Sequence, residues 1–393
     1  MTTPQIPDPI KDITELKAAL QLAVGLELST IPVYLTALYS IKDGHNADAA
    51  QTIRSVVMEE MLHMTLAANV LNALGQPPST SPVTFRSHQD VKPVPEYPHN
   101  NPLVSGIGDL ALLPLTPEAV SSFVKIEHPF HGAASLRGIR SGKDSYPTIG
   151  LFYEAITTAL DTLCTDDDFT PTNQVPSTRY YGGAGQVIEV STKEHALAAI
   201  HKIIDEGEGL PPDQLEKEAK KVTTEDKLNN GWQMYSHYAR FREIQVGRRF
   251  RSDQKAEEPP MGSLLLVDYD AVHPAVYVQR NGDAPGGPEG VALNQFDLAY
   301  TRLVDDLYLA FSGKKKKIEY RRNGETVVDY KDPLLLAVHG MWALKEKAVA
   351  LMRTPDPAHP ARRLCPRFHY AATADEQKKL KKEIELMRTG AST

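Results

Sequence analysis

The stretch Ser55-Val56-Val57-Met58-Glu59-Glu60-Met61-Leu62-His63-Met64 is the part of the sequence that decides the fold. The spacing of Glu60-x-x-His63 places a carboxylate and an imidazole one helical turn apart on one face of a helix. Apolar residues recur on that face at helical spacing, namely Ile53, Val56, Met64, Ala67 and Leu71. A charge on a core-facing stripe is costly unless something neutralises it, as a metal ion does. The pattern therefore predicts a helix that carries half of a two-metal carboxylate site in a helical bundle.

Composition narrows the class of protein. The chain has 393 residues, of which 41% are hydrophobic, and a formal net charge of −7. This length predicts two or three domains, or one large domain with appendages. The negative charge argues against a nucleic-acid binder, and the absence of an apolar run of about 18 residues argues against a membrane span. The polar N-terminus and the two distant cysteines, Cys164 and Cys365, indicate a cytoplasmic protein without disulfides.

Helical periodicity, together with capping and stop signals, predicts a mainly α-helical chain. Within residues 1–250 we expect a four-helix bundle with long irregular insertions, the first of them over residues 77–114. Pro32 is predicted to bend the first helix beside Glu27. The expected helices of this part are Asp12 to Ser40, Asn46 to Leu74, Thr116 to Glu127, Thr148 to Leu163, Ser191 to about Glu208, and Leu228 to Val246.

Residues 251–393 form a second predicted unit, a C-terminal helical appendage that packs on the bundle or is used to form a homodimer. A small β-hairpin is expected from Ile318 to Tyr330, because Asn323-Gly324 is a favoured turn at its centre. The helices expected around it are Asn294 to Ser312, Pro333 to Arg353 and Asp375 to Arg388. No pair of ligand-type residues on an apolar face stands out in this unit.

Six residues combine a metal-ligating side chain with a position on an apolar helix face. Four carboxylates balance the charge of two divalent ions, and each ion can take one imidazole. The set therefore predicts a site for two iron ions, with manganese as the alternative. The predicted ligands are Glu27, Glu60, His63, Glu154, Glu208 and His237.

Several neighbours of these residues have alternative interpretations. Glu127 is the substitute ligand if Glu154 does not reach the site. Glu59 and Glu206 adjoin predicted ligands but face other directions on their helices, so we expect them outside the ligand set. Arg240 and Glu243 share a helix with His237 and suit an ion pair that orients the site, although a solvated pair fits equally well.

Two longer stretches resemble a known family. Gly25-Leu26-Glu27-Leu28-Ser29-Thr30-Ile31-Pro32-Val33-Tyr34-Leu35-Thr36-Ala37-Leu38-Tyr39-Ser40-Ile41 and Glu59-Glu60-Met61-Leu62-His63-Met64 are similar to the ferritin-like domain of iminophenyl-pyruvate dimer synthases. Those enzymes couple intermediates in violacein- and rebeccamycin-type pathways. Shorter similarities are Phe152-Tyr153-Glu154-Ala155-Ile156, Glu206-Gly207-Glu208-Gly209 and Ser236-His237-Tyr238-x-x-Phe241, so the resemblance covers about residues 10 to 250. It implies a ferritin-like bundle and a role in secondary metabolism.

The sequence departs from that family in two ways. The synthases are much longer than this chain. Met234 also stands where a second Glu-x-x-His would have its glutamate, so the carboxylate must come from another segment.

The leading functional prediction is a non-haem di-iron oxidase or oxygenase that acts with O2 on a small, amino-acid-derived substrate. The alternatives are a dimer-synthase-like coupling enzyme, a ferroxidase or iron-handling protein without an organic substrate, and a metal-free scaffold.

Overall fold

The computed structural model describes residues 8–129, 144–178, 185–207, 235–251, 254, 258–277, 287–322 and 325–389. These residues are mainly helical, with a few short strands, which confirms the predicted fold class.

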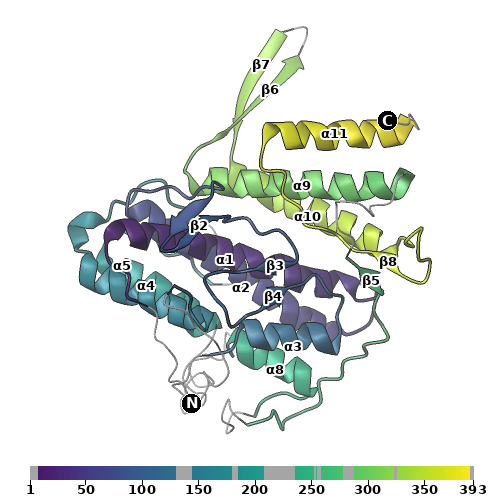
Figure 1. The fold of residues 1–393 in the computed structure, drawn as a ribbon, viewed down its shortest axis with the longest axis horizontal. Coiled ribbons are helices and arrows are strands. Elements are labelled where there is room, and N and C mark those ends of the chain that lie inside the picture. Colours follow the sequence, from purple (N-terminus) through teal and green to yellow (C-terminus); the bar gives the residue numbers. More distant parts are fainter. Residues whose placement is uncertain are drawn as a thin grey trace.

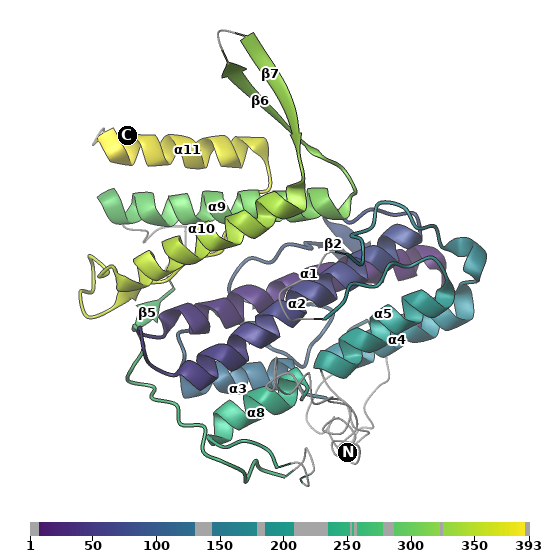
Figure 2. The same cartoon turned by 180° about the vertical axis from the view of Figure 1, so that it is seen from behind.

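Two long helices form the centre of the bundle. α1 (Ile13–Ser40) and α2 (Ala47–Ala73) lie side by side along most of their length (Figure 2). Asp12 caps α1 as predicted, because its side chain accepts a hydrogen bond of 2.8 Å from the backbone N–H of Glu15. By length and composition α1 could span a membrane, but 89% of its most apolar window is buried inside the protein. α1 is therefore placed as a core helix.

Two pairs of shorter helices complete the bundle. α3 (Pro117–Ile126) and α8 (His237–Val246) pack beside one half of the α1–α2 pair. α4 (Ile149–Leu163) and α5 (Lys193–Gly207) pack beside the other half (Figures 1 and 2). Each remaining position of a four-helix bundle is thus shared by two helices. Residues 130–143, between α3 and α4, and 208–234, between α5 and α8, lie outside the described residues.

The predicted bounds of three helices need correction, one of them in the C-terminal part, where the helix expected from Asn294 begins at Gly287. The helix expected from Leu228 to Val246 is not continuous, because α8 begins at His237 and the hydroxyl of its N-cap Ser236 accepts a 3.3 Å hydrogen bond from Ala239 N–H. Leu228 itself lies outside the described residues. The cap of α5 is Thr192, whose hydroxyl accepts a 3.2 Å bond from His195 N–H. Pro32 lies inside α1, which continues as helix through it to Ser40.

The irregular stretch over residues 77–114 lies along α1. It contains two small antiparallel pairs, β1 (Val83–Phe85) with β2 (His88–Val91) and β3 (His99–Asn100) with β4 (Asp109–Leu110). Between these pairs the backbone of Pro93 approaches Gly25 so closely that a Cβ atom on Gly25 would lie 2.3 Å from the Pro93 carbonyl oxygen. A glycine in the middle of α1 is explained by this contact.

The C-terminal residues add a second group of helices against the bundle. α9 (Gly287–Phe311) lies between α10 (Pro333–Arg353) and α11 (Ala374–Thr389) (Figure 1). Asn72 of α2 donates a 2.6 Å hydrogen bond to the Phe311 carbonyl, and one hydrophobic cluster spans both parts. β5 (Ala275–Val276) pairs in parallel with β8 (Arg363–Leu364). The division at residue 250 stays a prediction.

The predicted hairpin is confirmed in its strands. β6 (Lys316–Arg322) and β7 (Glu325–Lys331) pair antiparallel, in a register that runs from Lys316 opposite Lys331 to Arg322 opposite Glu325. The turn residues 323 and 324 lie outside the described residues.

Candidate metal centre

The candidate site lies beside the middle of α1 and α2. The ends of α3 and α5 and the start of α8 meet there. Glu27 and Glu60 come from the interiors of α1 and α2, with His63 one turn after Glu60. Glu127 directly follows the last residue of α3, and His237 is the first residue of α8. The breaks in the bundle therefore bring polar side chains from four elements to one buried place.

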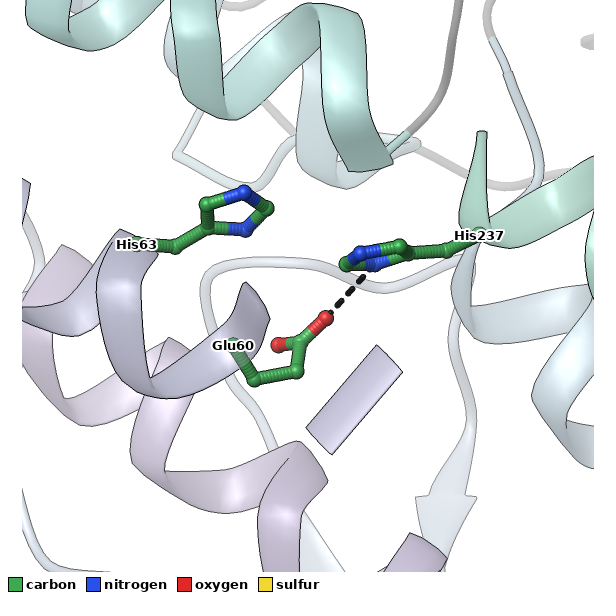
Figure 3. Close-up of side chains that lie close together, drawn as sticks. All are labelled: Glu60, His63 and His237. Atoms are coloured by element: carbon green, nitrogen blue, oxygen red, sulfur yellow. Dashed lines mark ion pairs between the residues drawn. The ribbon is translucent and has the colours of Figure 1, made fainter. Parts of the chain in front are cut away.

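Glu60, His63 and His237 form the centre of this cluster. Each offers a ligand atom within 4.8 Å of the others, and all three side chains are buried. Glu60 points toward the imidazole of His237, and its Oε1 lies 2.8 Å from Nδ1 of that ring (Figure 3). The two imidazole rings are stacked, with centroids 5.3 Å apart and planes inclined by 23°.

Three further carboxylates surround the two imidazoles. Glu27 Oε2 lies 3.6 Å from Nδ1 of His63, and Glu127 Oε2 lies 3.6 Å from Nδ1 of His237. On the other side of its ring, His63 Nε2 lies 2.9 Å from Oε2 of Glu206 near the end of α5. The structure thus brings Glu27, Glu60 and Glu127 to the Nδ1 atoms of the two imidazoles, with Glu206 at the opposite nitrogen of His63. Glu127 and Glu206 are not among the predicted ligands.

The predicted ligand Glu154 needs correction. Its side chain is exposed on α4, while the preceding residue Tyr153 is buried and donates a hydrogen bond to Oε1 of Glu27. Glu127 takes the expected place of Glu154, as the alternative interpretation foresaw. The helical periodicity of α4 did not distinguish the edge of its buried face from its exposed face.

The prediction for the end of α5 also changes. Glu208 lies outside the described residues, so its role as a ligand stays a prediction. Glu206 was expected to face elsewhere, but it contacts His63. Its position three residues after the buried Ile203 is the sequence signal for this inward orientation. His237 has no glutamate three residues before it. Glu206, near the end of α5, provides a carboxylate from another segment.

Three hydroxyl groups that the sequence analysis missed hold the carboxylates in place. Thr30 donates a 2.6 Å hydrogen bond to Oε2 of Glu60, Tyr34 donates to Glu127, and Tyr153 donates to Glu27. Thr30 and Tyr34 follow Glu27 at helical spacing on α1, which is the signal that could have found them. Such partners orient ligating carboxylates and are part of a metal site.

The far side of His237 is fixed by an ion pair. Its Nε2 lies 2.9 Å from Oε2 of Glu59, which also binds the guanidinium of Arg240. The expected pair between Arg240 and Glu243 is therefore wrong, because Glu243 pairs with Arg249 at 2.7 Å. Glu59, expected outside the ligand set, orients the imidazole from behind.

Burial and crowding of like charges dominate the electrostatics. Burial, together with Glu27, raises the pKa of Glu60, and burial with Glu60 raises the pKa of Glu127. Burial alone would lower the pKa of His63, but Glu206 and Glu27 outweigh it and raise the pKa to about 9. The carboxylates around His237, Glu127 foremost, likewise outweigh burial and hold its pKa well above the usual value. The buried carboxylates therefore stabilise positive charge on the groups between them.

The residues present fit a metal ion. A cavity of about 20 Å³, lined by Glu27, Glu60, His63 and Glu127 among others, is large enough for one water-sized occupant. His237 Nδ1 has no hydrogen bond of proper geometry among the described residues, despite the closeness of Glu60. Carboxylate oxygens and imidazole nitrogens without thiols are donors that suit iron or manganese.

A buried cluster of this kind in a helical bundle defines a metal-binding bundle protein. A family model described as Ferritin-like matches residues 20–246, which is more than half of the chain, so the chain belongs to the ferritin-like family. Its fold is that of di-iron-type proteins in general.

A solved structure supports the same fold. The chain is similar to a ferritin-like protein from Caulobacter vibrioides, with a TM-score of 0.54 and 21% identity over 91% of this chain and 100% of that one. No curated protein matches the chain. The resemblance to iminophenyl-pyruvate dimer synthases stays a prediction.

Proposed function

We propose that this protein is a non-haem di-iron oxidase or oxygenase that uses O2 to oxidise a small organic substrate. The observation that carries the proposal is the convergence of Glu27, Glu60, Glu127 and Glu206 on the imidazoles of His63 and His237. Four carboxylates offset the charge of two Fe(II) ions, and two imidazoles supply one nitrogen ligand for each. Bound iron supplies the redox chemistry with O2 that no side chain can perform.

The chain's own residues prepare the site for that chemistry. Burial raises the pKa of Tyr34 and of Tyr153 well above the usual value, so each phenol keeps its proton and remains a donor to its carboxylate. Thr30 fixes one oxygen of Glu60, which leaves the other directed at His237. These bonds set the orientation of the carboxylates before a ligand arrives, which lowers the reorganisation that binding requires.

Apolar residues line one wall of the cavity, and a substrate would approach the site along them. Ile149 and Gly150 begin α4, and Ile203, Ile204 and Gly207 end α5. A Cβ atom on Gly207 would lie at an ordinary contact distance of 3.9 Å from Oε2 of Glu127, so the end of α5 borders this carboxylate. A small substrate would meet the carboxylates between these two helices.

A second candidate is iron oxidation or storage without an organic substrate. The size of the cavity favours it, because about 20 Å³ accommodates an ion, water or O2 more readily than an organic molecule. A coupling activity like that of the dimer synthases is the third candidate, and it rests on the sequence resemblance alone.

Metal analysis and O2 uptake separate these candidates. Protein expressed with iron should bind about two iron ions per chain, and Glu60→Ala should lose them while its circular dichroism stays helical. Oxidation of a small amine or amino acid with matching O2 uptake supports the oxidase. O2 uptake that stops when added Fe(II) is exhausted supports iron handling. Retention of one metal or none under saturating iron contradicts the two-metal site.

A further inference from the structure

The β6–β7 hairpin is an arm with both edges unpaired. It rises from the helical body beyond α9 and α11 in both views (Figures 1 and 2). The described strands place nothing beside either edge, because this sheet consists of β6 and β7 only. An isolated two-stranded hairpin is marginally stable in water, and an unpaired edge is a template for another strand. What each edge would accept depends on its charges.

The β6 edge repels a second copy of itself. Antiparallel pairing of β6 with β6 about Glu319 would place Lys316 opposite Arg322 and Lys317 opposite Arg321, as well as Glu319 opposite Glu319. Like charges directly opposite each other across strands are destabilising. Lysine and arginine on an edge strand are also a common protection against edge-to-edge association. Pairing of β6 with itself in this central register is therefore unfavourable.

The β7 edge is complementary to itself. Antiparallel pairing about Val328 places Glu325 opposite Lys331 of the second copy at both ends of the strand. Between these ends, Thr326 lies opposite Tyr330, Val327 opposite Asp329, and Val328 opposite Val328. Opposite charges and aromatic or β-branched pairs across strands are stabilising. The same hairpin thus has one edge that excludes a second copy and one edge that fits it.

Apolar side chains of β7 are exposed in the single chain. Val328 is 44% exposed and Tyr330 is 60% exposed in the single chain. Alternate residues share a face of a strand, so Thr326, Val328 and Tyr330 lie on one face. Pairing with a second β7 would join two such sets into one continuous apolar strip across the new sheet. Lys331 pairs with Asp329 at 2.7 Å in the single chain, but an exposed pair of this kind contributes little.

We propose that β7 pairs with β7 of a second copy of this chain, antiparallel about a two-fold axis at Val328. The product is a four-stranded sheet in the order β6-β7-β7-β6, whose outer edges are the self-repelling β6 strands. The same surface of both copies is used, so the association closes at the dimer. The inference is independent of the metal site.

Sedimentation analysis of the full-length protein tests the proposal. We expect a dimer for the natural chain and a monomer for Val328→Lys, because two ammonium groups would then meet at the axis. Tyr320→Lys is the matched control, since Tyr320 is also 44% exposed but lies on β6. This control should remain dimeric. A monomeric natural chain, or a Val328→Lys variant that is still dimeric, would overturn the proposal.

A charge exchange tests the register of the pairing. Within the hairpin itself Glu325 faces Arg322 and Lys331 faces Lys316, so the folded state of each variant is compared as well. Glu325→Lys should weaken the dimer at least about tenfold, which corresponds to about 1.4 kcal/mol, because it then faces Lys331 of the second copy. Adding Lys331→Glu to the same chain restores opposite charges across the axis and should recover the affinity. A double variant that dimerises no better than Glu325→Lys contradicts the proposed register.

Oxidative cross-linking tests directly whether Val328 of the two copies lie opposite each other at the two-fold axis. The two natural cysteines, Cys164 and Cys365, are buried. A cysteine introduced into the β6–β7 hairpin is therefore the exposed thiol that an oxidant reaches. Opposite residues of antiparallel strands have Cα atoms about 4.5–5.5 Å apart, within the range of a disulfide. Val328→Cys should therefore form a covalent dimer on mild oxidation, whereas Tyr320→Cys should not. Equal cross-linking of the two variants would exclude the β7 edge as the interface.

Discussion

Glu60 is a buried carboxylate with a different partner at each of its two oxygens. Thr30 donates a hydrogen bond to one of its oxygens, and Nδ1 of His237 lies 2.8 Å from the other. The nearby charge of Glu27 raises the pKa of Glu60 further, after burial, which has the largest effect. Carboxylates this close together are stable in a core only if positive charge accompanies them. Metal ions provide that charge, and they require the imidazoles to be neutral when they bind.

The contact between Glu206 and His63 can be tested by substitution. Glu206→Gln should lower the iron content of the protein, because it removes a carboxylate that lies 2.9 Å from Nε2 of His63. Loss of a ligand or of a group that orients one typically costs about 10- to 100-fold in metal affinity. Glu154→Gln is the matched control, since Glu154 is exposed on α4. Equal iron loss in both variants, measured by elemental analysis, would return Glu154 to the site.

Which site residues the sequence could predict depended on where they lie in their helices. Glu60 and His63 are inside α2, where helical periodicity alone sets their direction. Glu127 and Glu206 lie at the ends of α3 and α5, where the buried stripe stops and the chain turns. Periodicity carries little information there, because the last residues of a helix are oriented by their tertiary neighbours.

Among the elements, α1 contains a glycine that only a contact outside the helix explains. Gly25 has the poorest helix propensity of the ordinary residues, and alanine is better by about 1 kcal/mol in an exposed helix. The carbonyl of Pro93 nevertheless occupies the place of its side chain, since a Cβ atom would lie 2.3 Å from that oxygen. The irregular stretch over residues 77–114 can therefore lie directly on the helix backbone.

Replacing this glycine should destabilise the protein although it improves the helix. We expect Gly25→Ala to lower the free energy of unfolding by about 1–3 kcal/mol, because the backbone of Pro93 must move. In α10, a Cβ atom on Gly340 would meet Leu303 at an ordinary 3.6 Å. Gly340→Ala should thus be neutral or stabilising by up to about 1 kcal/mol. Urea titrations of both variants measure the difference, and two changes of the same sign would refute this account.

At the scale of the whole molecule, residues 77–114 join the bundle to the C-terminal part. The hydroxyl of Tyr97 donates a 2.7 Å hydrogen bond to the Ser29 carbonyl in α1, and Tyr277 donates a 2.6 Å bond to the Tyr97 carbonyl. His99 lies edge-on beside Tyr97, with ring centroids 6.5 Å apart. The region between the bundle and the C-terminal helices therefore includes a half-buried imidazole.

The stability of the folded chain should respond to pH through His99. Burial lowers the pKa of His99 in the folded protein to about 4 from an ordinary value of 6.5, so between these values the unfolded chain binds more protons. This contribution to stability is complete above about pH 6.5 and is lost as the pH falls toward 4, by at most about 1.4 kcal/mol per pH unit.

Variants at two histidines isolate this contribution. His99→Gln should flatten the dependence of the free energy of unfolding on pH between about 4 and 6.5, because the variant has no group to protonate there. The same substitution at the exposed His339 should leave the slope unchanged, since that side chain is solvated in both states. Urea titrations over this pH range give the slopes. If the His99→Gln curve parallels that of the natural chain, burial of His99 is not the cause.

Spacing along the chain was sufficient to predict the helical class, the central pair α1 and α2, the hairpin strands, and the half-site Glu60-x-x-His63. These features depend on spacing within a single element, and helical or strand geometry converts that spacing into a direction. Only the tertiary structure decided that two positions of the bundle are filled by broken helices, and that their ends bring Glu127, Glu206 and His237 together. The physical reason is that helix ends from distant segments meet through packing of the whole core, which local periodicity does not encode.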